Sequence, residues 1–318
     1  MIIRISHSTS LRYSQPVVQS ISEFRMAPKS DATQTLKSFA LHVRPHARVH
    51  QFHDFLGNTV HTFSLRSGHD AVDITANSIV LTHPEPFDPA AATDRWPLAD
   101  QQNNVHTADY LILRGPVHWH SVLHEMLAEI NAKPGQPVTA ILERTNRLVR
   151  QWFAYRKNVT HSGSTIEALI QIGSGVCQDF AHLLLALLRA QGIPARYCSG
   201  YVHRTKRKHD AESHAWVEAW LPSAGWVGLD PTIGDWCDPG FVKVAHGRDY
   251  SDVPPNRGIY RGNAEEDMSV SVRVEALDEL PNQLDFELFD PLSAPAASRL
   301  PPPAGRPVAD PPQTVPPV

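Results

Sequence analysis

Apolar and polar residues alternate with a period of two along the first 83 residues, which is the pattern of half-buried strands. Examples of this alternation are Phe39, Leu41 and Val43, and Val72, Ile74 and Ala76. Gly57-Asn58 separates the stretches Val49–Leu56 and Thr59–Ser64, and such a dipeptide is a signal for a two-residue hairpin loop. Short strands separated by turns predict an N-terminal β-sandwich.

Beyond residue 106 the apolar period becomes that of a helix. The segment 84–105 carries Pro, Asp and Asn, and we interpret it as a linker. One amphipathic helix is expected to be capped by Thr139. Its apolar face comprises Ile141, Leu142, Thr145, Leu148, Val149, Trp152 and Phe153. A second helix, which Ser174 can cap, repeats leucines at spacings of three and four and stops at Gly192.

Three strands are predicted after the second helix, at Ala195–Val202, His214–Leu221 and Trp226–Leu229. A turn at residues 222–225 joins the last two as a hairpin. Since side chains alternate between faces, a register centred on Pro222 places His214 directly opposite Asp230. A two-residue loop would instead shift the pairing, so that the contact would need a bulge or a diagonal approach.

The predicted fold class is α+β, in three parts. Residues 1–105 form the N-terminal β-sandwich with its linker, and residues 106–280 form a domain of helices packed on an antiparallel sheet. Met268–Leu277 is read as one further strand of that domain. The last part, 281–318, is a Pro-rich tail that we expect to be disordered or polyproline-like.

Composition narrows the class of protein. A hydrophobic fraction of 42% over 318 residues supports a substantial core, and the net charge of −4 gives no global reason to expect nucleic-acid binding. The chain contains no apolar run long enough to cross a membrane and no signal-peptide core at its start. Cys177, Cys198 and Cys237 do not make a disulfide framework, so we expect a reducing cytoplasm.

The stretch Gly173–His182 carries the first chemical signal. Its cysteine, Cys177, follows a glycine-bounded loop and stands in the first turn of the second helix. Unpaired backbone N–H groups and the positive end of the helix dipole favour a thiolate there. The same N–H groups can bind an oxyanion when that thiolate attacks a carbonyl group.

An imidazole and a carboxylate follow in the predicted hairpin. His214 lies 37 positions after Cys177, and Asp230 lies 16 positions after His214. A thiol, an imidazole and a carboxylate are a nucleophile, its base and the group that orients the base. Taken singly, each residue is as readily explained by core packing or by a turn; together they predict a catalytic triad.

The stretches Gly175–His182, His214–Trp220 and Gly228–Thr232 resemble the transglutaminase-like superfamily, in its bacterial branch. The segments Asp54–Asn58 and Gly247–Gly258 also resemble that branch, so the resemblance spans residues 1 to about 277. It implies a papain-like catalytic core in residues 106–280. In that core Cys177 would be the nucleophile, His214 the base and Asp230 the orienting carboxylate. The resemblance is compatible with proteases and amidases as well as with cross-linking enzymes.

The sequence therefore predicts a cysteine-dependent enzyme that transfers acyl groups from peptide or side-chain amides. Hydrolysis is the favoured outcome because water is abundant, and transfer to an amine is the alternative. The expected partner is a peptide or protein, with no nucleic acid, no membrane, no cofactor and no metal. A non-catalytic protein-binding module is the rival from another class, and a zinc hydrolase is a second enzymatic rival.

Several other polar residues are weaker candidates. His118, His120 and His124 have the spacing of a metal site but lack a nearby fourth ligand. His182 points away from Cys177 round the helix and is expected to be a packed or capping histidine. Asp179 either accepts hydrogen bonds near the helix start or touches the active site, and Glu218 either lies behind His214 or is a paired strand carboxylate. The basic loop comprising Arg204, Lys206, Arg207 and Lys208 is either solvated or a selector of acidic substrates.

Overall fold

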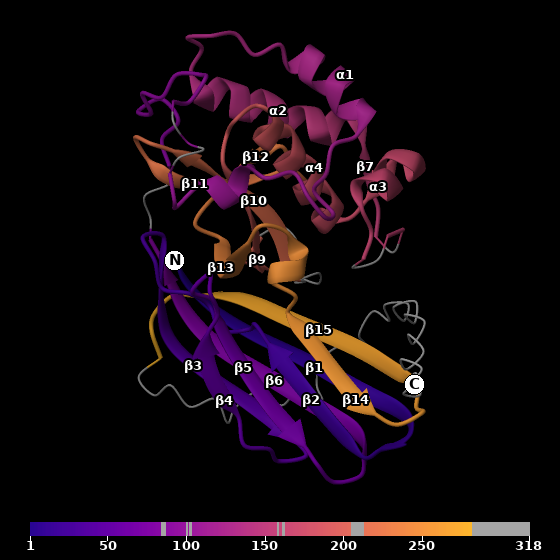
Figure 1. The fold of residues 1–318 in the computed structure, drawn as a ribbon. Helices are drawn as coiled ribbons and strands as arrows, with labels where there is room; N and C mark the ends of the chain where they lie inside the picture. The colour runs from indigo at the N-terminus through magenta and orange to yellow at the C-terminus, as the bar shows by residue number, and fades with distance from the viewer. Residues whose placement is uncertain are drawn as a thin grey trace, which may run out of the picture.

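The computed structural model describes residues 1–83, 87–99, 101, 104–157, 159–160, 163–204 and 213–281. The helices lie at one end of the molecule, a β-sandwich lies at the other, and a five-stranded sheet lies between them (Figure 1). The architecture is α+β, as the sequence predicts. Lys206, Arg207, Lys208 and the Pro-rich tail lie outside the described residues.

The sandwich consists of two four-stranded antiparallel sheets, ordered β15-β1-β6-β3 and β14-β2-β5-β4. The strands are β1 (Ile2–Val17), β2 (Gln19–Phe24), β3 (Gln34–Arg44), β4 (His50–His53), β5 (Thr59–Leu65), β6 (His69–Thr82), β14 (Asn256–Arg261) and β15 (Glu266–Leu277). Along β1, every second side chain from Ile3 to Tyr13 is buried. This period of two is the reason that the segment forms a strand with one face against a core.

The last two strands differ from the predicted organisation. β14 pairs with β2 and β15 pairs with β1, so the chain returns to the sandwich after the second domain. Residues 256–277 therefore complete the sandwich sheets, although the sequence division placed them with residues 106–280. The predicted two-residue hairpin loop is also wrong: His53 pairs with Thr59, which leaves a five-residue loop, Asp54–Asn58.

The second domain packs four helices on a five-stranded antiparallel sheet with the order β12-β11-β10-β9-β13. The helices are α1 (Ser121–Ile130), α2 (Val138–Trp152), α3 (Ile166–Ile172) and α4 (Cys177–Ala190). The sheet strands are β9 (Ala195–Val202), β10 (Ser213–Leu221), β11 (Gly225–Asp230), β12 (Asp235–Trp236) and β13 (Phe241–Gly247). Two short parallel strands, β7 (Ala154–Tyr155) and β8 (Ser174–Gly175), precede α4. Two 3₁₀ turns are η2 (Ala108–Leu111) and η3 (Tyr250–Asp252).

Helix α4 is the centre of this domain. Its side chains from Phe180 to Leu188 are almost completely buried, and the helix packs against β9, β10 and the other helices. A helix that is apolar on all sides is stable only in such a surrounded position. Helix α2 has the predicted amphipathic face, but it begins at Val138 and Thr139 lies inside it, so Thr139 does not cap it.

The two domains share buried structure. Ile3, Ile5 and Val80 of the sandwich belong to the same apolar core as α4, whereas Leu11 and Ile74 belong to the sandwich core. One face of β1 therefore contributes to both cores. Its N-terminal half packs in the core around α4, and its C-terminal half packs in the sandwich core. The described part of the predicted linker also packs on the second domain, since the Trp96 indole N–H donates to the Gln191 carbonyl oxygen at 2.8 Å.

Two carboxamides of the sandwich cover the free edge of β13. Gln34 accepts from the N–H of Lys243 at 2.7 Å and donates to its carbonyl oxygen at 2.8 Å. Asn58 pairs in the same way with the N–H and carbonyl oxygen of His246, at 3.0 and 2.9 Å. The Asp54 side chain accepts two backbone N–H groups of the five-residue loop and thereby presents Asn58. These contacts replace the strand partner that an edge otherwise lacks.

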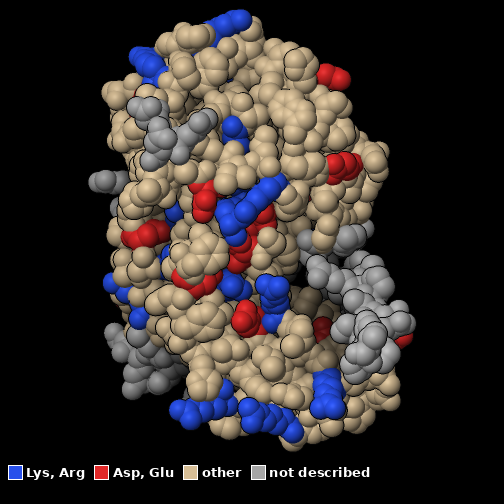
Figure 2. All heavy atoms as spheres, in the orientation of Figure 1, with Lys and Arg blue, Asp and Glu red and all other residues tan. Residues whose placement is uncertain are grey.

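Charged side chains are unevenly spread over the surface. On the face drawn in Figure 2, acidic and basic groups lie side by side where the five-stranded sheet meets the sandwich, and several Lys and Arg side chains lie at the sandwich end. In the described part of the chain, no helix has the length and apolar character needed to cross a bilayer.

Candidate active site

Cys177 is the first residue of α4 and is half-buried. The predicted cap, Ser174, lies in β8 instead, and the extended residue Val176 occupies the cap position. The Asp179 carboxylate, one turn into the helix, accepts the Val176 N–H at 2.8 Å and the Thr160 hydroxyl at 2.5 Å. The first turn is therefore held by an acid at its third position, where the helix dipole also favours negative charge.

Gly175 makes this arrangement possible. A β-carbon at Gly175 would lie 2.7 Å from the Asp179 carboxylate and 2.8 Å from Leu169. Neither neighbour has room to move, because Asp179 and Leu169 are both buried. The glycine before the cysteine is thus explained by the close approach of the capping carboxylate rather than by the turn conformation that the sequence suggested.

His214 enters from β10, where it pairs with Gly200 of β9. Its ring lies near the indole of Trp216 and the ring of Phe241, with centroids 6.5 and 6.1 Å away. A β-carbon at Gly200 would lie 2.7 Å from the Trp216 indole and 2.0 Å from the Val242 carbonyl oxygen. Because position 200 is glycine, the Trp216 indole can pack directly against the sheet.

Asp230 ends β11 and is fully buried. One carboxylate oxygen, Oδ1, accepts the backbone N–H and the hydroxyl of Thr232, at 2.9 and 2.7 Å. The other oxygen, Oδ2, accepts one hydrogen bond from Nε2 of His214 and one from Nη2 of Arg204, each at 2.9 Å. The turn fixes one oxygen, and the second is left for the imidazole and the guanidinium.

The structure corrects the predicted register of the hairpin. Leu221 pairs with Gly225 and Trp220 with Trp226, so that the loop has three residues, 222–224. Trp216, rather than His214, is the position that this register brings opposite Asp230. His214 and Asp230 share a face as expected but meet along the diagonal, a contact that the sequence had expected only for a two-residue loop.

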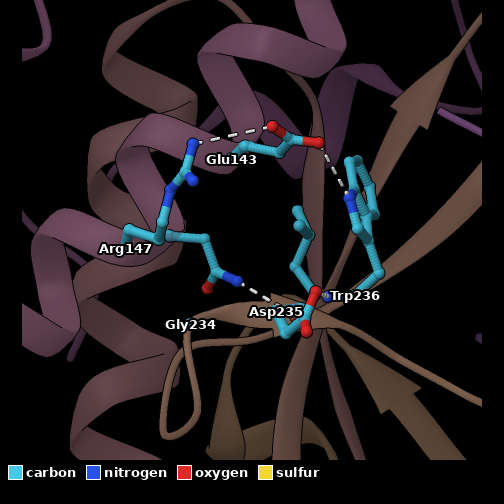
Figure 3. A pocket seen from close by; sticks show the side chains of 7 residues that line it. Glu143, Arg147, Gly234, Asp235 and Trp236 are labelled. Carbon is cyan, nitrogen blue, oxygen red and sulfur yellow. Dashed lines mark hydrogen bonds and ion pairs between the residues drawn. The ribbon is translucent and has the colours of Figure 1, made fainter. Parts of the chain in front are cut away.

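Helix α2 supports the turn that follows Asp230. Figure 3 shows Glu143 between Arg147 and the indole of Trp236, and Glu143 accepts the Trp236 indole N–H at 3.2 Å. Asn146, fully buried, donates to the Asp235 carbonyl oxygen at 3.0 Å. These groups line a pocket of about 150 Å³ behind the turn, and none of Cys177, His214 and Asp230 lines it. The pocket is a gap beside the supporting contacts.

The three groups are electrostatically coupled. Burial acts to lower the pKa of His214, but the Asp230 carboxylate outweighs it and, with a smaller contribution from Cys177, raises that pKa to about 10. The thiol of Cys177 lies close enough to the ring to interact with it. Because Nε2 is taken by Asp230, Nδ1 is the nitrogen left for the thiol. Burial opposes a low pKa of Asp230, yet His214 and Thr232 hold it below the usual range. This geometry favours the protonated, imidazolium form of His214.

Most of the weaker candidates have structural partners. His182 is buried, lies against the Tyr197 ring and accepts the Tyr250 N–H at 3.2 Å. Glu218 is buried between Arg196 and Lys243, so it is a paired structural carboxylate. His118 pairs with Glu167 and His120 caps α1.

Arg204 is the functional contact that the sequence missed. The basic loop was expected to be solvated or substrate-selecting, and the described member of it binds Asp230 instead. No spacing rule links a residue just beyond β9 to the end of β11, because β10 lies between these two strands.

A helix that begins at a cysteine and packs on an antiparallel sheet carrying histidine and aspartate defines a papain-like core of the transglutaminase type. Residues 125–231 match the model of the transglutaminase-like superfamily, and residues 3–81 match that of the bacterial transglutaminase-like N-terminal region. The chain belongs to this superfamily and carries both of these regions.

The chain is also similar to three individual proteins, two by sequence and one by structure. An uncharacterized protein of Mycobacterium leprae is 34% identical over 284 residues, which are 86% of this chain and 99% of that one. A protein-glutamine gamma-glutamyltransferase of Pseudomonas aeruginosa is 31% identical over 150 residues, 43% of this chain but 22% of its own length. A Cytophaga hutchinsonii structure, proposed to be a cysteine protease, superposes with a TM-score of 0.71 at 22% identity over 90% of this chain and 95% of that one. This last likeness concerns the fold.

Proposed function

We propose that the chain is a cysteine-dependent acyl-transfer enzyme that acts on peptide or side-chain amides and, by default, hydrolyses them. The observation that carries the proposal is the His214–Asp230 hydrogen bond of 2.9 Å beside a thiol at the start of α4. In this proposal Cys177 is the nucleophile, His214 is the acid and base, and Asp230 orients the imidazole.

The reaction has two steps. The Cys177 thiolate attacks the amide carbonyl carbon, and the C–N bond breaks as the His214 imidazolium gives its proton to the leaving nitrogen. The product is an amine, and the acyl group remains on sulfur as a thioester. Water then attacks the thioester carbonyl and loses a proton to His214, the C–S bond breaks, and the thiolate–imidazolium pair returns. Backbone N–H groups at the start of α4, with that of Cys177 among them, bind the oxyanion in both steps.

Transfer to an amine is the second candidate, and the named activity of the Pseudomonas aeruginosa relative favours it. An amine would replace water in the second step, so the first step is common to both reactions. The proposed substrate is a peptide or protein, and no nucleic acid, membrane, cofactor or metal takes part in the reaction as proposed. We also propose a reducing compartment, the cytoplasm, because the three cysteines are free thiols and Cys177 must stay reduced.

One screen separates the two reactions. Peptides and glutamine-bearing acyl donors are incubated with the protein, with and without a labelled primary amine, and ammonia, free carboxylate and labelled adduct are measured. Hydrolysis predicts carboxylate without adduct, whereas transfer predicts an adduct that grows with amine concentration. Cys177→Ala is the control, and turnover that persists in this variant would exclude the thiol mechanism. A non-catalytic binding module predicts no product from any donor.

A further inference from the structure

Arg204 lies just beyond the end of β9 and joins the buried carboxylate at the centre of the site. Its Nη2 donates to Oδ2 of Asp230 at 2.9 Å, and Nε2 of His214 lies at 2.9 Å from the same oxygen. The Asp230 side chain is 0% exposed, whereas that of Arg204 keeps 35% of its surface in solvent. One buried oxygen therefore serves two cationic groups.

The titratable groups around Asp230 and His214 come from several elements. Cys177 approaches His214 from α4, Tyr197 of β9 faces Cys177, and Cys237 faces Asp230 from beyond β12. Burial raises the pKa values of Tyr197 and Cys237, so both are neutral near pH 7. Asn146 and Thr232, the remaining polar contacts, carry no charge. Among the residues that the structure describes, Arg204 is thus the cation that shares Asp230 with His214.

We infer that Arg204 is a positioning residue for the proposed acyl transfer: it fixes the Asp230 carboxylate against His214 and limits how strongly that carboxylate holds the imidazole proton. The purpose of this role rests on the proposed function, whereas the experiment that tests it does not require that function. In the second step His214 must accept a proton from water and later release it, and an unshared buried carboxylate would hold that imidazole proton more strongly still. A guanidinium on the same oxygen weakens that attraction.

An ordinary surface ion pair would not have this effect. Exposed pairs are screened by water and change little when one partner is removed. Here the carboxylate is buried and already paired, so that loss of Arg204 leaves one negative charge balanced by His214 alone. The same argument predicts that a lysine keeps part of the effect, since it restores the charge without the planar fork of donors.

The test measures the protonation of His214 directly and requires no substrate. In a Cys177→Ala background, histidine ring carbons are labelled and titrated by NMR, and the His214 signal is assigned by its loss in His214→Gln. Arg204→Gln is expected to raise the pKa of His214 by about one pH unit, and Arg204→Lys by less than half of that. Arg12→Gln, which removes an exposed arginine paired with Asp73 in the sandwich, is the matched control and should leave the pKa unchanged.

Each outcome decides the inference. An unchanged His214 pKa in a folded Arg204→Gln protein would overturn it. A higher KM for anionic substrates, with the pKa unchanged, would also overturn it and would assign Arg204 to substrate binding. A raised pKa accompanied by slower thioester breakdown in the Cys177 protein supports it. If the pKa rises but the parent protein turns over no donor, the positioning role stands and the proposed function fails.

Discussion

At the scale of single residues, each side of the His214 ring has a different neighbour. Nε2 faces Asp230, Nδ1 is left for the Cys177 thiol, and the ring lies near Trp216 and Phe241. The carboxylate fixes which nitrogen carries the proton toward it, and the aromatic side chains lie beside the ring. The imidazole is therefore oriented before any substrate binds, which is the condition for efficient proton transfer.

The first prediction concerns the thiols. Cys177 should react with iodoacetamide at pH 7 at least tenfold faster than Cys198 or Cys237, because His214 favours its thiolate. Burial raises the pKa values of Cys198 and Cys237 well above the usual range, so their thiolates are scarce. Peptide mapping after timed labelling gives the three rates. Equal rates would contradict the assignment of Cys177 as nucleophile.

The second prediction concerns the orienting carboxylate. Asp230→Asn keeps the size of the side chain but removes the charge that stabilises the imidazolium, so kcat should fall by about 10²–10⁴ with a smaller change in KM. The variant should also label more slowly at Cys177, since a neutral imidazole no longer favours the thiolate. Steady-state kinetics with a donor from the screen provides the measurement, and Asp73→Asn, an exposed carboxylate of the sandwich, is the control. A kcat equal to that of the parent would remove Asp230 from the mechanism.

At the scale of secondary structure, the start of α4 sets where the thiol stands. The helix is held by Asp179, which can reach the Val176 N–H only because Gly175 has no side chain. The elements themselves follow from the sequence: the predicted strand Ala195–Val202 is β9, and His214–Leu221 falls within β10. Their apolar periodicity is local, so it can be read without knowing the fold.

What could not be predicted depends on contacts between distant parts of the chain. β15 has the alternation of a strand, but its partner β1 begins at the other end of the chain, and no local signal names it. The diagonal approach of His214 to Asp230 depends on a shift of one residue in the centre of the loop, from Pro222 to Ser223. Likewise, Ser174 and Thr139 have the right chemistry for caps, yet tertiary packing starts both helices elsewhere. The three triad candidates could be named from sequence, whereas their geometry and the part of Arg204 could not.

The third prediction concerns the start of α4. Gly175→Ala would place a methyl group 2.7 Å from the Asp179 carboxylate, so we expect unfolding free energy to fall by about 1–3 kcal/mol. Labelling of Cys177 should also slow, because the first turn of α4 must shift. Gly68→Ala is the matched control, since a β-carbon there meets nothing within 4 Å. Denaturant unfolding of both variants provides the measurement, and equal stability would contradict the packing argument.

At the scale of the whole molecule, the sandwich and the second domain are packed together rather than merely linked. It contributes Ile3 and Ile5 to the core around α4, and Gln34 and Asn58 close the edge of β13. Behind them a buried charge network connects Glu218 to Lys243, and Lys243 to Asp31 of the sandwich. Separating such a pair leaves an uncompensated buried charge, which is strongly destabilising, so the two domains should unfold together.

The fourth prediction tests this coupling. Asn58→Ala removes two hydrogen bonds to the His246 backbone and leaves a buried N–H and carbonyl group unpaired, at a cost of about 2–4 kcal/mol. We expect one cooperative unfolding transition at lower denaturant in this variant. Gln151→Ala, which changes an exposed amide on α2, should have little effect. Two separated transitions in the parent protein would show that the domains are independent.

The response to acid follows from three histidines near the boundary between the domains, of which two are buried and one is half-buried. His7 donates to or accepts from the Tyr201 hydroxyl at 2.8 Å, His182 lies beneath η3, and His246 belongs to β13. Burial lowers the pKa of His7 to about 4, and burial together with neighbouring cations lowers those of His182 and His246 to about 3. Below the ordinary histidine pKa of 6.5 the unfolded chain binds protons at these positions and the folded chain does not.

Stability should therefore be flat above about pH 7 with respect to these groups and fall as the pH drops from 6.5 toward 4. Each histidine contributes a slope of about 1.4 kcal/mol per pH unit, or about 4 kcal/mol per unit for the three. Urea unfolding at pH 7, 6 and 5 measures this loss directly. His7→Gln keeps a hydrogen-bonding side chain that does not titrate and should reduce the slope by about a third. His50→Gln, at an exposed position of β4, should leave the slope unchanged. If the parent slope is near zero in this range, protons reach the three histidines in the folded state, and the boundary between the domains opens in acid before the chain unfolds.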